Sequence, residues 1–299
     1  MLPQDIVLRF TLGMSAMFTF YWFISHVVLR PISRRRAFSR TAKKLCSLLI
    51  LYLPGLGLLY LFIKDLPMQK LTGLTYGFKD FGIIFLAQNA VIIVIAVITL
   101  IEAKVSKKEL KKIDEDTIYD STLDVALLLL AIPLLEEFVT RKLLADRAGG
   151  EHLWLFLLLS ALTFSLIHLQ TGRIAVAVGM LYSGFLWALI YAASQSLWLS
   201  TLYHVANNVL LTFLPEQIKK KVSDKVHNVY IAVIALSGVV GIVLFLMNSS
   251  RLLPSTQGLS THIRRVFMNP GTWLLIAVCM GSFALAVLKR SRERRIKSY

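Results

Sequence analysis

Four side chains that can do chemistry, Glu136, His168, His204 and Asn208, lie in stretches of sequence that are otherwise apolar. A charged side chain in the middle of a membrane costs about 2.5–3.5 kcal/mol on insertion scales, so such residues are rare and usually functional. A carboxylate can act as a general base on a water molecule, and His168 can help to hold that water. His204 and Asn208, four residues apart and so on one helix face, can donate hydrogen bonds to a developing oxyanion. These residue types therefore indicate hydrolysis by an activated water.

The first three of these residues, Glu136, His168 and His204, are also a candidate zinc site, with an open coordination position for water. No His-Glu-x-x-His motif and no cluster of Cys and His supports a metal directly. The two cysteines, Cys46 and Cys279, lie in apolar stretches and lack the spacing of metal ligands. The sequence therefore leaves open whether zinc or side chains alone activate the water.

Glu137 and Arg141 are predicted to form a structural ion pair, because residues four apart share one face of a helix. Glu136 is turned about 100° away from Glu137 at 3.6 residues per turn, which leaves it free to face a site. In the alternative interpretation both glutamates lie near the outer interface and are merely solvated, since Lys142 and Asp146 are close in sequence.

The histidines also have structural interpretations. His168 taken alone is most simply a packing residue near a helix end. A buried His204–Asn208 pair can simply link two helices, which is a common use of polar residues in membranes. The combination favours chemistry, because a carboxylate, two histidines and an amide occur together in three neighbouring apolar stretches.

At these residues the chain resembles the CPBP intramembrane proteases, the CAAX-protease and bacteriocin-processing family, also called Abi. The family includes the Ras-converting type of CAAX prenyl endopeptidase. The resemblance rests on three motifs in order, Glu136-Glu137-Phe-Val-Thr-Arg141, Phe164-Ser-Leu-Ile-His168 and His204-Val-Ala-Asn-Asn208. It covers about residues 122–210 of the 299. Lys142 departs from the family pattern, in which glycine commonly follows the arginine.

The resemblance implies an intramembrane endopeptidase in which Glu136 and His168 activate the attacking water. It also implies that His204 and Asn208 form the oxyanion site. The family has been labelled as metalloproteases and also explained by a glutamate-activated water, so the only cofactor it suggests is zinc. Some members are described as scaffolds without demonstrated proteolysis.

Two other classes of function compete with a protease. A non-catalytic membrane scaffold would use the same buried network to hold helices together. A proton-coupled transporter would use buried Glu, His and Arg as a relay. Against the transporter, the sequence contains neither repeat-related halves nor paired broken helices.

The elements that must position these residues are membrane-spanning helices. Hydrophobic residues make up 56% of the chain and charged residues only 17%, against roughly a quarter charged in a soluble domain. A helix needs about 20 apolar residues to cross the hydrocarbon core, where lipid offers backbone groups no partners. The sequence predicts an all-α, polytopic transmembrane bundle of about nine spans: 6–29, 45–63, 81–101, 122–144, 153–170, 174–193, 197–214, 229–247 and 272–288.

The net charge of +16 follows a membrane pattern and argues against a nucleic-acid partner. Most Lys and Arg residues fall in loops that lie inside if the N-terminus is outside and the C-terminus is cytoplasmic. These inner segments are 30–44, 102–121, 171–173, 215–228 and 289–299. We expect a multi-pass protein of the cell (inner) membrane of a bacterium, with the lipid bilayer and a membrane-associated peptide or protein substrate as its partners.

Loop lengths divide the chain into three parts. Residues 1–121 are predicted to give three accessory transmembrane helices, and residues 122–214 a catalytic core of four closely joined helices. Residues 215–299 are predicted to add two accessory helices and a basic tail. The chemistry is therefore expected in the middle part.

Overall fold

The computed structural model describes residues 3–29, 40–106, 122–148 and 152–297. Within these ranges the protein is helical and contains no strand, as the sequence predicts. Much of the two predicted inner loops, 30–44 and 102–121, lies outside the described residues.

The helices follow the predicted apolar stretches closely. The first part of the chain contains α1 (Pro3–Phe23) with the π-helical turn η1 (Ile24–Leu29), α3 (Arg40–Ile63), α4 (Phe78–Gln88) and α5 (Val91–Ser106). The middle part contains α6 (Thr122–Ala126), η2 (Leu127–Ala131), α7 (Ile132–Glu137), η3 (Phe138–Leu143), α8 (Leu144–Ala148), α9 (Leu153–His168), η4 (Leu169–Thr171), α10 (Ile174–Ser194), α11 (Leu197–Asn208), η5 (Val209–Phe213) and α12 (Leu214–Lys221). The last part contains α13 (Asp224–Met247), α14 (Ser249–Leu252), α15 (Leu259–Phe267) and α16 (Pro270–Lys297).

Five helices of the described residues are long and apolar enough to cross a membrane. They are Asp5–Phe23, Phe78–Lys104, Ile174–Ser194, Asp224–Met247 and Pro270–Leu288. Two more apolar helices, Leu48–Ile63 and Leu153–His168, are shorter. An integral membrane protein is therefore supported. The count of nine spans and the N-outside orientation stay predictions.

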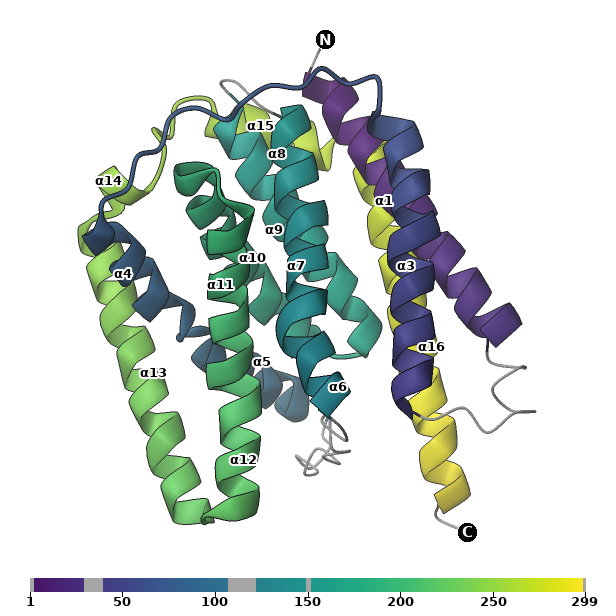
Figure 1. Ribbon diagram of the computed structural model, residues 1–299, viewed down its shortest axis with the longest axis vertical. Helices are drawn as coiled ribbons and strands as arrows, with labels where there is room; N and C mark the ends of the chain where they lie inside the picture. The colour runs from purple at the N-terminus through teal and green to yellow at the C-terminus, as the bar shows by residue number, and fades with distance from the viewer. Residues whose placement is uncertain (1–2, 30–39, 107–121, 149–151, 298–299) are drawn as a thin grey trace.

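The central helices form the core of the bundle, and the helices from the two ends of the chain flank it (Figure 1). In α10, 61% of the candidate span is buried, against 17% in α13, so α10 is central and α13 peripheral. Helix α10 packs on α9 and α5, while α1, α3 and α16 form a second group (Figure 1). The start of α1 and the end of α16 lie at opposite ends of the bundle.

The predicted span 122–144 is not one regular helix. Two π-helical segments, η2 and η3, flank the six residues of α7 that contain Glu136 and Glu137. A further π-helical segment, η5, follows Asn208 directly in the predicted span 197–214. π-Helical turns are rare in proteins, and those that occur often lie at functional sites. Here they lie next to both motifs that carry acidic or amide side chains.

One end of the core, the upper end in Figure 1, is covered by the connection between α3 and α4 and by the connection between α14 and α15. Leu66 and Leu71 of the first connection are buried, and Gln69 N donates to Asp146 O at 2.9 Å. Trp154 Nε1 donates to Ser255 O of the second at 2.7 Å. These contacts tie both connections to the helices that carry the motifs.

The α3–α4 connection and the start of α4 are bonded to α14. Asp80 accepts from Gly77 N at 2.9 Å and pairs with Arg251 Nη2 at 2.5 Å. Burial raises the pKa of Tyr76, and the nearby Asp80 raises it further, so the hydroxyl stays protonated and donates to Leu252 O. These bonds hold the connections in place at the upper end of the core.

Candidate active site

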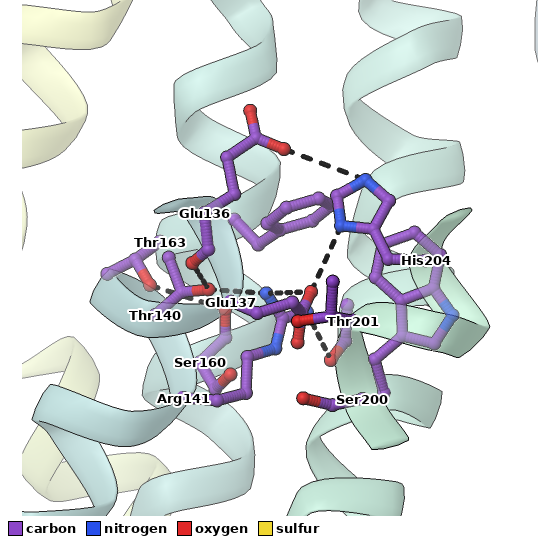
Figure 2. Close-up of polar contacts among 12 residues, drawn as sticks. Glu136, Glu137, Thr140, Arg141, Ser160, Thr163, Ser200, Thr201 and His204 are labelled. Atoms are coloured by element: carbon purple, nitrogen blue, oxygen red, sulfur yellow. Dashed lines mark hydrogen bonds and ion pairs between the residues drawn. The ribbon is translucent and has the colours of Figure 1, made fainter. Parts of the chain in front are cut away.

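The motif helices bring Glu136, Glu137 and His204 together inside the core. Helix α7 carries Glu136 and Glu137, α9 carries His168 at its end, and α11 carries His204. Figure 2 shows the Glu136 carboxylate pointing toward the His204 ring, and Oε2 lies 3.6 Å from Nε2. The His204 side chain is only 4% exposed and that of Glu136 11%. The contact therefore joins two helices within a region shielded from solvent.

Glu137 is the centre of a buried network. Its Oε1 atom forms an ion pair with Arg141 Nη1 at 3.2 Å and a hydrogen bond with His204 Nδ1 at 3.1 Å (Figure 2). Both Glu137 and Arg141 have side chains with no exposed surface. Beyond the predicted i, i+4 pair, Glu137 thus also bonds to His204 across the helix interface. Because an ionised carboxylate only accepts hydrogen bonds, Nδ1 of His204 carries the proton of this bond.

Arg141 has several partners besides the Glu137 carboxylate. It donates to Gly184 O of α10 at 3.2 Å and to the Thr140 hydroxyl. Its guanidinium carbon lies 4.5 Å from the centre of the Phe164 ring, a cation–π distance. These contacts connect η3 to both α9 and α10.

His168 is linked to His204 through the ring of Phe164. The centre of that ring lies 4.7 Å from the His168 ring and 5.5 Å from the His204 ring. His168 Nδ1 lies 2.8 Å from Phe164 O. A carbonyl only accepts, so Nδ1 carries the proton and Nε2 is left as an acceptor.

Asn208 is the last residue of α11, one turn beyond His204 on the same helix face. It is partly exposed, whereas the neighbouring Asn207 is 4% exposed. The structure therefore joins Glu136 and His204 directly and His168 through Phe164. Asn208 follows His204 along α11.

Three further residues near the site do not belong to the motifs. Trp187 of α10 stacks on His204, with ring centres 4.1 Å apart and planes 23° apart. Gln88 Oε1 accepts from Trp187 Nε1 at 3.0 Å. Tyr52 of α3 is buried and interacts electrostatically with Glu136. One signal in the sequence points to this group, the polar pair Gln88-Asn89 inside the apolar stretch 81–101.

The described residues contain no group of three His, Cys, Asp or Glu side chains placed to hold a metal ion. Two of the candidate zinc ligands, Glu136 and His204, lie near each other. Nδ1 of His204 is bonded to Glu137 and Nδ1 of His168 to a backbone carbonyl, so Nε2 of each ring is the atom that would bind a metal. Zinc stays an expectation from the sequence.

Residues 119–210 match the family model described as Rce1-like, type II CAAX prenyl endopeptidase. The match includes all three motifs and confirms the family resemblance drawn from them. No curated protein and no solved structure matches the chain.

Proposed function

We propose, from the premise that the central segment of this chain belongs to the CPBP family of CAAX-type proteases, that the protein is an intramembrane endopeptidase using a water activated by Glu136. The observation that carries the proposal is the approach of Glu136 Oε2 to His204 Nε2 at 3.6 Å, between two helices of the matched segment. Catalytic contacts are often this long before substrate binds.

The charges of the buried cluster favour the protonation states of Glu136 and His204 that such a reaction needs. Glu136, Glu137 and Arg141 together carry one excess negative charge when all are ionised. A protonated His204 brings the total to zero, which avoids an uncompensated charge in a poorly solvated site. The same total results when the proton sits on Glu136 instead. We infer that one proton is shared between Glu136 and His204.

In the reactive arrangement Glu136 is a carboxylate and His204 an imidazolium. Glu136 takes one proton from the water, and the water oxygen forms a bond to the carbonyl carbon of the scissile peptide. Nε2 of His168 accepts from the second hydrogen of the water and orients it. Nε2–H of His204 and the Asn208 amide donate to the oxyanion. Glu136 then passes its proton to the leaving nitrogen as the C–N bond breaks.

Glu137 and Arg141 have a positioning role in this scheme. Glu137 holds Nδ1 of His204 at 3.1 Å, which turns Nε2 toward Glu136. Arg141 neutralises Glu137 at 3.2 Å and anchors it to α10 through Gly184 O. Because the ring is fixed at Nδ1, the oxyanion donor is aimed before substrate arrives, and less reorganisation is needed in the reaction.

A groove beside the site suits the apolar part of a membrane-associated substrate. It has a volume of about 520 Å³ and lies between the α6–α7 segment and α11, the two elements that carry Glu136 and His204. Leu134, Thr201 and Val205 are among its lining residues. The upper end of the core is covered, so we propose that substrate enters from this side or from the lower end. A peptide ending in a prenylated Cys-a-a-X sequence is the substrate class that the matched family suggests.

The test is hydrolysis of a prenylated Cys-a-a-X peptide by the purified full chain in proteoliposomes prepared in H₂¹⁸O. We expect release of the a-a-X tripeptide and one ¹⁸O atom in the new carboxyl group of the prenylated cysteine, because water attacks the carbonyl carbon. Mass spectrometry of both products measures this. His204→Ala is expected to reduce the rate by about 10²–10³-fold, the typical effect of removing one oxyanion donor.

His227→Ala provides the matched control, since His227 lies at the start of α13 and its ring contacts the adjacent Asn228. This variant is expected to cleave like the wild type. A folded wild-type protein that releases no tripeptide from prenylated or unprenylated peptides would contradict the proposal and favour a scaffold. Proton-coupled flux of a solute that depends on Glu136 would favour a transporter.

A further inference from the structure

We propose that Gln88, which lies outside the segment matched by the family model, is a positioning residue that fixes His204 through Trp187. The inference rests on the proposed function for the catalytic importance of His204. The orientation of the His204 ring by Gln88 and Trp187 does not depend on that function. It assigns a role to the broken helix α4–α5, for which the sequence predicts no purpose beyond that of an accessory wall.

Trp187 stacks on the His204 ring. The indole lies nearly parallel to the imidazole, with the ring centres 4.1 Å apart. Phe164 closes the aromatic group by meeting both rings edge-on, 5.4 Å from Trp187 and 5.5 Å from His204. A stacked ring restrains rotation about the last side-chain torsion of His204, which the bond from Nδ1 to Glu137 alone leaves partly free. The plane of Trp187 therefore sets the direction of Nε2.

A hydrogen bond to Gln88 holds the Trp187 side chain in place. Its side chain is completely buried, and an indole N–H in such a place needs an acceptor. Gln88 Oε1 supplies it at 3.0 Å, and Gln88 is also completely buried. The Nε2 atom of Gln88 has no hydrogen-bond partner among the described residues, so the bond to Trp187 is the interaction that defines the orientation of this amide.

Gln88 lies at the break between α4 and α5, and the backbone there is held by the neighbouring helix α13. Asn89 Nδ2 donates to Ser237 Oγ of α13 at 3.0 Å, directly beside the break between α4 and α5. Helix α13 also approaches the backbone of the break very closely at Gly241, where an added Cβ would lie 2.2 Å from Ala87 N. Both contacts with α13 hold the break, and they keep Gln88 at a fixed point in the core.

The proposal predicts that removing the acceptor of Gln88 impairs turnover rather than binding. Gln88→Met keeps the length of the side chain but leaves Trp187 Nε1 without an acceptor. We expect kcat for the prenylated Cys-a-a-X peptide to fall by about tenfold with KM unchanged, because small misplacements of a reacting group have large effects on rate.

Gln88→Glu retains an acceptor oxygen and is expected to recover most of kcat. Trp187→Phe, which keeps an aromatic ring without an N–H, is expected to resemble Gln88→Met, and the double variant to be no worse than either.

Tyr182→Phe is the matched structural control, because it removes one hydrogen bond at the same helix break without touching Trp187. It is expected to lower the melting temperature as much as Gln88→Met does but to leave kcat unchanged. Equal losses of kcat in the two variants would overturn the positioning role and assign the effect to general destabilisation. Unchanged kcat in Gln88→Met would overturn it as well.

A spectroscopic readout separates this proposal from the proposed function. In protein labelled with ¹⁵N at tryptophan and histidine, Gln88→Met should shift the Trp187 indole resonance and the His204 ring resonances, whereas Tyr182→Phe should leave both in place. If the wild type cleaves no peptide but these shifts appear, the proposed function fails and the positioning of His204 stands. If the His204 resonances do not move in Gln88→Met, the positioning proposal fails whatever the protein cleaves.

Discussion

Glu136→Gln is expected to lower kcat for a prenylated Cys-a-a-X peptide by about a thousandfold, within the range that general base catalysis contributes. The amide keeps the shape of the side chain but cannot take a proton from water. Its nearest catalytic partner, Nε2 of His204 at 3.6 Å, also loses the carboxylate with which it shares a proton. KM is expected to stay the same, because Glu136 contributes to the transition state rather than to ground-state binding. Single-turnover assays in proteoliposomes measure both constants.

Glu216→Gln is the matched control for this substitution. Glu216 is a carboxylate of α12 with a side chain 13% exposed, close to the 11% of Glu136, and it pairs with Lys220 outside the site. Its substitution is expected to leave kcat within about twofold of the wild type, because surface ion pairs contribute little. Comparable cleavage by Glu136→Gln and the wild type would remove Glu136 from the mechanism.

Arg141→Met is expected to destabilise the protein by about 3–5 kcal/mol, the usual cost of removing one partner from a buried ion pair. Arg141 has no exposed side-chain surface, and its loss leaves Glu137 with only His204 to balance its charge. The bond to Gly184 O and the packing on Phe164 are lost as well. Unfolding in mixed micelles with increasing SDS measures the change in free energy.

Two comparisons identify the cause of this loss. The double variant Arg141→Met/Glu137→Gln is expected to recover about 2 kcal/mol, because no uncompensated charge is left in the core. Lys142→Met removes the neighbouring i, i+4 pair with Asp146, where the side chains are 42% and 25% exposed, and is expected to cost less than about 1 kcal/mol. Equal destabilisation by Arg141→Met and Lys142→Met would mean that the buried pair does not stabilise the core.

Local spacing predicts the interactions that lie within one helix. The Glu137–Arg141 pair follows from residues four apart, and the structure has it at 3.2 Å. The long helices follow from the apolar stretches, because unpaired backbone groups are too costly in lipid. The contact of Glu137 with His204 is not predicted by spacing, since it depends on how α7 and α11 pack.

Interactions set by packing are the ones that the sequence does not predict. Helices α4 and α5 separate at Asn89-Ala90 without a proline or glycine at the break, and the contact with Gly238 and Gly241 of α13 accompanies it. Trp187 occurs in an ordinary apolar span, so nothing in its neighbourhood distinguishes it from core filling. The link from His168 to His204 through Phe164 is likewise set by packing, since the two histidines lie on different helices.

In the proposed mechanism Glu136 and His204 lie on either side of the reacting carbonyl. A structure of the wild-type chain bound to a prenylated peptide ketone, which hydrates to mimic the tetrahedral intermediate, tests it most directly. We predict one hydrate oxygen at hydrogen-bond distance from the Glu136 carboxylate and the other at that distance from Nε2 of His204 and the Asn208 amide. A ketone bound elsewhere in the bundle, with Glu136 and His204 in contact only with each other, would contradict the account.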